Sequence, residues 1–197
     1  REYVEFPLQY RKYEKVGFGT PTGKFELYST MMRDWGYDPL PSHIEPPESP
    51  VRTPERYKDF PLVLITGAKQ PMYMHSQSRQ LESIRRLAPE PLLEIHSQTA
   101  RALDIREGDF AWIETARGRL RMKAHLHERI HEKVVAIPHG WWRPEEDGPL
   151  HGIFETCSNI LTDDDPDQCD FSFGSSPPKG LLCRVYKASD EIAGAAH

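Results

Sequence analysis

The stretch FAWIETARGRLRMKAHL, residues 110–126, decides the fold. In its second half, residues 118–126, apolar and polar residues alternate without exception, which is the pattern of a strand with one face in water. Residues 110–115 supply a second strand, and Ala116-Arg117-Gly118 supply the turn between the two. The stretch therefore predicts a β-hairpin that turns one face toward a core.

Short apolar runs on both sides of this hairpin predict further strands. They cover residues 62–65, 92–95, 134–137 and 181–186. Two short helices are predicted, one over residues 81–87 and one that starts at Ser97 as its N-cap and ends before Glu107. Many short strands with few helices favour a mainly β fold, a β-barrel, over a parallel α/β sheet.

The first 55 residues have a different character. They hold a dense share of the 18 prolines, so we expect an extended arm that leaves a preceding domain. Within it, residues 22–29 predict a short strand and residues 30–37 one or two helical turns. The expected division is an arm over residues 1–55, a barrel over 56–190 and a tail over 191–197. Because no initiator Met or signal peptide opens the sequence, we expect a piece of a longer protein.

Composition narrows the class of protein. With 25 basic and 30 acidic residues the net charge is −5, which gives no electrostatic reason to expect nucleic acid. No apolar run approaches the roughly 20 residues that a membrane span needs. The three cysteines, Cys157, Cys169 and Cys183, form no CxxC pair, which argues against a disulfide framework and against a zinc or iron–sulfur site made by this chain. Either the cytosol or the periplasm is compatible with so few cysteines.

Two polar loops follow predicted strands early in the barrel. The first offers a glycine for close backbone approach and phosphate partners such as Arg79; its candidates are Thr66, Gly67, Lys69, His75, Ser76 and Gln77. The second lies at a helix start, where free N–H groups suit an anion; its candidates are His96 and Thr99. An ordinary turn and a plain helix cap are the alternatives, and for each loop alone they are favoured.

Two more loops follow later strands. His139, Gly140, Trp141 and Trp142 could stack on a heterocycle, with core packing as an equally strong alternative. Asn159 could recognise the edge of a heterocycle, because an amide both donates and accepts. The acidic run of residues 163–165 that follows is expected to be a solvated loop, because consecutive side chains diverge.

Two tempting sites carry weaker arguments. His125, His127 and His131 could ligate zinc, but no fourth ligand has a suitable spacing, so we interpret them as a solvated or interface stripe. Cys157 has no identifiable base beside it and is not expected to act as a nucleophile.

The order of these loops resembles a known family. The series Leu-Ile-Thr-Gly (64–67), Glu-Ile-His-Ser-Gln-Thr-Ala (94–100), His-Gly-Trp-Trp (139–142), Asn-Ile-Leu-Thr (159–162) and Cys-Arg-Val-Tyr-Lys (183–187) is similar to the C-terminal domain of the dimethyl sulfoxide reductase superfamily. Residues 88–91 and 139–145 look closest to the branch that contains acetylene hydratase and thiosulfate/polysulfide reductase-like proteins. The resemblance covers roughly residues 60–187.

This resemblance implies a double-psi β-barrel of the aspartate-decarboxylase-like kind. It also implies a bis(molybdopterin guanine dinucleotide) cofactor that holds molybdenum or tungsten, with catalysis and a [4Fe-4S] cluster in other domains of the parent oxidoreductase. Partners would be those domains and an iron–sulfur electron-transfer subunit. The candidates above would hold the cofactor, with Lys179 as a further contact, and the isolated chain would be inactive.

Two departures and two alternatives accompany the resemblance. Ala68 stands where the family often has Arg, and Asp165-Pro166 is followed by Asp167-Gln168 rather than Ser-Gly. One alternative is a separate small cofactor-binding subunit, and the other is a non-enzymatic interaction barrel that lacks the cofactor.

Overall fold

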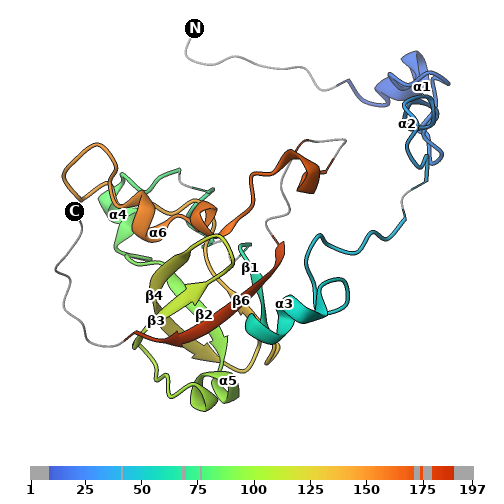
Figure 1. The fold of residues 1–197 in the computed structure, drawn as a ribbon. Helices are drawn as coiled ribbons and strands as arrows, with labels where there is room; N and C mark the ends of the chain where they lie inside the picture. The colour runs from blue at the N-terminus through green and yellow to red at the C-terminus, as the bar shows by residue number, and fades with distance from the viewer. Residues whose placement is uncertain are drawn as a thin grey trace, which may run out of the picture. The chain divides into compact units, whose positions relative to one another are not determined.

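The computed structural model describes residues 9–40, 42–67, 70–75, 77–170, 174 and 179–188, with the side chain of Lys179 excepted (Figure 1). The chain divides into two compact units, residues 1–44 and residues 45–197. The predicted site residues Lys69 and Ser76, the side chain of Lys179 and the predicted tail at 191–197 lie outside the described part. Among the helices described, none is long and apolar enough to cross a membrane.

The second unit is built on a closed barrel of six strands. The strands are β1 (Leu62–Ile65), β2 (Leu92–His96), β3 (Phe110–Glu114), β4 (Arg119–His127), β5 (Val134–Ala136) and β6 (Lys179–Lys187). Their order around the barrel is β1-β5-β2-β4-β3-β6. The pairs β1–β5 and β2–β4 are parallel, and the other pairs are antiparallel. This is the mainly β barrel that the strand pattern predicted, and its closed six-stranded form agrees with the double-psi barrel that the family resemblance implied.

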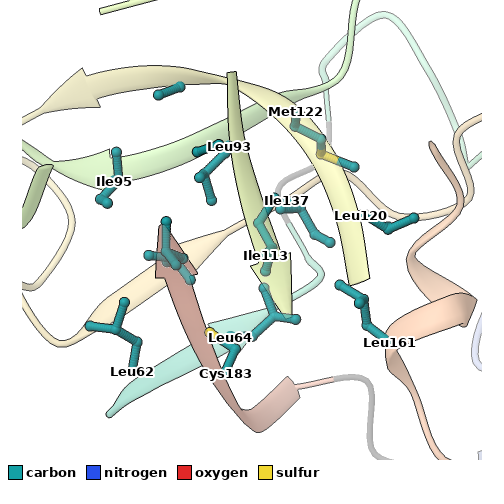
Figure 2. Close-up of a cluster of buried hydrophobic side chains, with 14 of the residues drawn as sticks. Leu62, Leu64, Leu93, Ile95, Ile113, Leu120, Met122, Ile137, Leu161 and Cys183 are labelled. Atoms are coloured by element: carbon teal, nitrogen blue, oxygen red, sulfur yellow. The ribbon is translucent and has the colours of Figure 1, made fainter. Parts of the chain in front are cut away.

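Alternation along the strands fills the barrel. In the hairpin of β3 and β4, Ala111, Ile113, Leu120 and Met122 are buried and their neighbours are not, as the sequence pattern predicts. Side chains from the other strands complete one core, and Figure 2 shows Leu161 among them although it does not come from a strand. Burying each of these side chains contributes about 1.5–3 kcal/mol relative to leaving it in water.

Strand direction gives the barrel two different ends. Strands β1, β5 and β3 run in one direction, and β2, β4 and β6 run in the other, as the parallel and antiparallel pairings require. The first three therefore finish at the end of the barrel where the other three begin. We call this the loop end, and the end where β2 and β4 finish the opposite end. Figure 1 shows helices α4 (Glu82–Arg85) and α6 (Ile153–Thr156) together near the loop end and α5 (Ser97–Ala102) at the opposite end.

Two details of the predicted helices change. Helix α4 is shorter than the predicted 81–87. The N-cap of α5 is His96 rather than Ser97, because the imidazole Nδ1 of His96 accepts a hydrogen bond from the Gln98 N–H at 3.1 Å. Two short 3-10 helices follow α6, η1 (Ser158–Leu161) and η2 (Pro166–Gln168).

Residues 45–59, which we call the strap, belong to the barrel unit. They end in helix α3 (Pro54–Asp59), and their Glu48 is 3% exposed. Its carboxylate accepts hydrogen bonds from Arg117 in the β3–β4 turn at 2.6 Å and from the backbone N–H of Leu182 in β6 at 3.3 Å. The predicted boundary at residue 55 therefore differs from the observed one between Ile44 and Glu45, since a buried carboxylate ties the strap to the barrel.

The first unit holds helices α1 (Lys12–Val16) and α2 (Thr30–Asp34). The prediction of helical turns after residue 30 is confirmed, and Ser29 caps α2 by accepting from the Met32 N–H. The predicted strand over residues 22–29 is wrong: these residues form turns and bends, in which Glu26 accepts hydrogen bonds from the backbone of Thr22 and Thr30. No residue between 9 and 40 is buried.

Candidate functional site

The loop end brings together most of the predicted site residues that the structure describes. Thr66 and Gly67 follow β1, and His75 and Gln77 lie in the loop after it. His139, Gly140, Trp141 and Trp142 follow β5, and Asn159 lies in η1. Lys179 starts β6 at the same end, opposite Ile65. Residues far apart in the sequence meet here because parallel β1 and β5 finish side by side.

His75 and His139 form the first contact across this end. Their rings meet edge to face with centroids 5.1 Å apart. His75 is exposed and adopts a left-handed backbone conformation with φ 55°, and Gly140, next to His139, has φ 68°. Gln77 pairs with Met74 through a short β-bridge and keeps its side chain exposed. These groups present hydrogen-bonding edges at the surface of the end.

Arg79 joins the two long loops beneath this surface. Its side chain is fully buried, and its guanidinium donates to Tyr73 Oη at 2.8 Å, to the Ala88 carbonyl at 3.1 Å and to the Trp142 carbonyl at 3.2 Å. It also lies 4.0 Å from the centre of the Trp141 ring, a cation–π contact. Arg79, named above as a phosphate partner, thus holds residues 70–88 to residues 141–145.

The two tryptophans have different environments. Trp141 is 3% exposed and packs edge to face on Tyr73, so one face of its ring contacts protein rather than solvent. Trp142 is half-buried and meets the ring of His151 edge to face. For Trp141, core packing accounts for the ring itself, and only its indole N–H remains to be explained.

Helix η1 covers the β3–β4 turn with Asn159 exposed on it. The buried Thr115 hydroxyl donates to the Leu161 carbonyl at 3.0 Å and fixes this segment on the barrel. A side chain at Gly118 would come within 2.8 Å of the Ile160 carbonyl oxygen, so only glycine allows η1 to lie this close. Upstream, Thr156 donates to the Trp141 carbonyl at 3.4 Å, which connects η1 to the tryptophan loop.

Three buried side-chain atoms have no hydrogen-bond partner among the described residues: Arg79 Nη2, Trp141 Nε1 and Ser158 Oγ. All three belong to loops at the loop end. The carboxylate of Glu145 lies 3.7 Å from Arg79 Nη2, beyond hydrogen-bond distance. Because buried polar groups in folded proteins nearly always have a partner, donors gathered at one end point to a polar ligand there. Their chemistry, an indole N–H, a guanidinium and a hydroxyl, suits an acceptor-rich or anionic group.

His96 and Thr99 lie at the opposite end, away from the other predicted site residues. His96 is 8% exposed; besides capping α5, its Nε2 lies 2.8 Å from a carboxylate oxygen of Glu128. The Thr99 hydroxyl donates to the Glu132 carbonyl at 2.6 Å. Both ring nitrogens and the hydroxyl are therefore used within the chain, and a role for these two residues toward a cofactor stays a prediction.

A network of ion pairs flanks the loop end on the strap side. Arg117 bridges the carboxylates of Glu48 and Asp163, and Arg56 reaches Glu48 at 2.8 Å. The expectation that residues 163–165 are all solvated is wrong for Asp163, which is half-buried, and its hydrogen bonds with Arg117 hold its pKa below the ordinary value. Beside the network opens a cleft of about 570 Å³, lined by Arg52, Arg56, Glu55 and Asp165 among others.

The three histidines considered as zinc ligands contact protein groups, and His131 accepts a hydrogen bond from the Lys133 N–H at 3.0 Å. His125 lies 3.0 Å from Glu107, and His127 lies 3.4 Å from Glu94. Over the described ranges, no group of three or more His, Cys, Asp or Glu side chains could hold a metal ion. All three cysteines are free thiols, and burial raises the pKa of the Cys183 thiol.

Sequence reasoning missed Ser158 and the Glu48–Arg117–Asp163 network. Ser158 stands directly before Asn159, and no local signal separates a buried hydroxyl from an exposed one. Glu48 lies between prolines in a stretch that looked like an exposed arm, and its partner Arg117 is 69 residues away. Only the fold brings these residues together.

Comparison with known proteins gives a consistent picture. The family model "Molydopterin dinucleotide binding domain" matches residues 62–172, more than half of the chain. Dopamine dehydroxylase of Eggerthella lenta is 38% identical over 184 residues, and acetylene hydratase of Syntrophotalea acetylenica is 34% identical over 207 residues. These alignments cover 90% and 94% of this chain but 18% and 27% of the relatives. A solved structure of acetylene hydratase from Pelobacter acetylenicus superposes with a TM-score of 0.81 and 32% identity over 94% of this chain and 26% of that one.

Proposed function

The chain belongs to the molydopterin dinucleotide binding domain family of the dimethyl sulfoxide reductase superfamily, and from this premise we propose that its loop end binds a bis(molybdopterin guanine dinucleotide) cofactor. The observation that supports this place most directly is the set of three buried, unpartnered polar atoms at that end. A pterin dinucleotide is rich in carbonyl, ring-nitrogen and phosphate acceptors, which these donors could satisfy.

The chain's residues would share the work of binding. Trp141 Nε1 and Ser158 Oγ would donate hydrogen bonds from the buried side of the site. Polar edges nearer the surface would come from His75, Gln77, His139 and Asn159. Arg79 would act chiefly as the fixed link between the loops, with Nη2 as its one group left for a ligand. Thr66 and Gly67, at the end of β1, would contribute backbone close to the cofactor.

The proposal places the chemistry outside this chain. The cofactor would supply a molybdenum or tungsten centre held by dithiolene sulfurs, and the chain would enclose and orient it. We therefore expect no turnover from the isolated chain.

A larger oxidoreductase is the proposed setting. The chain spans about a fifth to a quarter of the length of the relatives named above. In its N-terminal unit Leu27, Phe25 and Trp35 are 78%, 70% and 60% exposed, and none of residues 9–40 is buried, so the described part of this unit has no core of its own. Further domains of the same polypeptide would cover these side chains and carry a [4Fe-4S] cluster, and an iron–sulfur subunit could pass electrons.

The test uses the whole polypeptide that carries this chain, purified from cells that make the cofactor. We expect molybdenum or tungsten together with two pterin dinucleotides per chain, measured by elemental and pterin analysis. A well-folded polypeptide with neither metal nor pterin would overturn the proposal and favour a non-enzymatic interaction barrel.

The site itself is tested by Ser158→Ala. Loss of an unpaired buried hydroxyl should leave the unfolding free energy of the 197-residue chain unchanged or slightly higher, yet lower cofactor affinity about tenfold, the equivalent of roughly 1.4 kcal/mol. Ser97→Ala, the same substitution at the opposite end, is the matched control and should change neither quantity. Equal cofactor affinity in both variants would show that the cofactor does not contact η1.

A further inference from the structure

The outer wall formed by β3, β4 and β6 carries an unusual set of side chains. Alternation turns Phe110, Trp112, Arg119, Arg121 and Lys123 outward, since the residues between them on each strand are buried, and Tyr186 lies opposite Trp112 on the same face. We call these six residues the cationic face. The strand register makes them neighbours: Trp112 pairs with Arg121 on one side and with Tyr186 on the other.

Aromatic rings hold the cations of this face in place. The Arg119 guanidinium lies 4.4 Å from the centre of the Trp112 ring, and that of Arg121 lies 4.8 Å from the centre of the Phe110 ring. A guanidinium stacked on a ring loses little further rotamer freedom when it binds a carboxylate, because its planar set of N–H donors is already oriented. The face is therefore preorganised for an anionic partner.

The two stacked arginines differ from the cations around them. Arg184 pairs with Glu114 at 2.6 Å, Lys187 with Asp109 at 2.8 Å, and Lys123 with Glu90 at 2.8 Å. Arg119 and Arg121 make no close ion pair with any described residue, and Glu114, which stands opposite Arg119 in the strand register, is already paired with Arg184. Four cations on this wall, Arg119, Arg121, Lys123 and Arg184, therefore share two carboxylates, Glu114 and Glu90, although the chain as a whole carries a net charge of −5. This local excess of positive charge favours charge complementarity with an acidic partner.

The composition of the face points to a reversible protein contact. Arg, Trp and Tyr are the residues that dominate binding energy at protein interfaces, whereas permanent interfaces are more uniformly apolar. The exposed side chains of the N-terminal unit, such as Leu27 and Phe25, are of the apolar kind. The cationic face is rich in arginine and aromatic residues, as reversible interfaces are. A separate polypeptide therefore fits it better than another domain of the same chain.

We propose that the cationic face docks an extended acidic segment of a separate polypeptide. Arg119 and Arg121 are alternate residues of one strand, so their side chains leave the sheet about 6.6 Å apart. An extended segment with Asp or Glu at alternate positions has the same repeat and can place one carboxylate on each guanidinium. Aromatic and aliphatic groups beside these carboxylates would contact Phe110 and Tyr186. The proposal is independent of the cofactor, which would lie at the loop end rather than on the wall.

The experiment measures binding of a fluorescein-labelled decapeptide of alternating Glu and Thr to the 197-residue chain by fluorescence anisotropy. We expect saturable binding that weakens as salt rises from 20 to 200 mM, because the contact is electrostatic. Arg119→Ala and Arg121→Ala should each weaken binding about fivefold or more, and the Lys variants should restore part of it. Arg101→Ala, an exposed arginine of α5, is the matched control and should have no effect. Thermal unfolding of each variant establishes that it is folded.

Three results would overturn the proposal. The first is absence of binding at 20 mM salt, and the second is equal binding of the alternating Gln–Thr peptide, which would remove the role of carboxylates. The third is tighter binding of a labelled single-stranded dT12 oligonucleotide that depends on the same arginines, which would assign the face to nucleic acid.

Discussion

The two ends of the barrel are built from the same strands but serve different purposes. At the opposite end, polar groups are satisfied within the chain: His96 caps α5 and contacts Glu128, and the Thr99 hydroxyl donates to a backbone carbonyl. At the loop end, long loops are tied together by a buried arginine, and buried donors on three of its residues have no partner in the described chain. One end closes the fold, and the other leaves hydrogen-bonding capacity for something else.

Because of this difference, substitutions can separate residues that bind the cofactor from residues that stabilise the fold. Substitutions at the opposite end should change stability without changing cofactor binding. At the loop end the two effects should divide by residue, according to whether a side chain is bonded within the chain or unpartnered.

The largest effect is expected from Arg79→Met. Three acceptors, Tyr73 Oη and the carbonyls of Ala88 and Trp142, would lose a buried donor, at about 1 kcal/mol each, for a loss of about 3 kcal/mol in the free energy of unfolding. Urea unfolding of the 197-residue chain measures this. Arg86→Met, which removes an exposed arginine of the same region, should cost less than about 0.5 kcal/mol. Equal losses would show that Arg79 does not hold the two loops together.

Gly118→Ala comes next, because its methyl group would collide with the Ile160 backbone at 2.8 Å. Overpacking of this kind costs about 1–3 kcal/mol, and here it should also displace η1 and lower cofactor content. Gly19→Ala meets no atom within 4 Å and should be neutral. A crystal structure of Gly118→Ala with η1 unmoved would contradict this expectation.

His96→Ala should cost about 1 kcal/mol through the lost cap of α5, measured by urea unfolding. Ser97→Ala should leave the free energy of unfolding unchanged, because Ser97 is not the cap. The cofactor content of the whole polypeptide should be normal in both variants. A large loss of cofactor in His96→Ala alone would return this residue to the binding site.

The smallest effect concerns Asp163, whose pKa is held below its ordinary value of 3.8 by hydrogen bonds with Arg117. A carboxyl with a lowered folded-state pKa contributes stability above its unfolded value, and this contribution is lost as the pH falls through the folded value. Below about pH 4, the wild-type chain should therefore lose stability more steeply than Asp163→Asn. Unfolding in urea at pH 5, 4 and 3 compares them. Asp109→Asn, at the opposite end, removes a carboxyl whose pKa Lys187 lowers. It should flatten the curve less, because Asp109 pairs with a single partly exposed lysine whereas Asp163 accepts two hydrogen bonds from Arg117.

Local pattern was enough for the strands but not for the first unit. The alternation in residues 118–126 persists over nine positions, so a single register explains every one of them. Residues 22–29 show a similar but shorter pattern, and the described part of the chain holds no strand that pairs with them. Hydrogen bonds that the backbone N–H groups of Thr22 and Thr30 donate to the Glu26 carboxylate stabilise turns instead.

The sequence predicted which loops carry the candidate site residues. It did not predict which of those loops contact one another. Each strand end in the sequence marks a loop, and the order of those loops carried the family resemblance. Which loops share an end depends on strand direction, which no loop contains in its own residues. His96 and Thr99 were grouped with the others for that reason, although β2 runs antiparallel to β5 and places them at the far end.

By itself the sequence determined the mainly β barrel, most strand positions and the family, because alternation and motif order are properties of the chain read in line. Tertiary structure alone decided that Arg79 is a buried link, that Asp163 and Glu48 share Arg117, and that three donors are buried without partners. The physical reason is that these contacts join segments up to 134 residues apart, and closing the barrel is what brings those segments into contact.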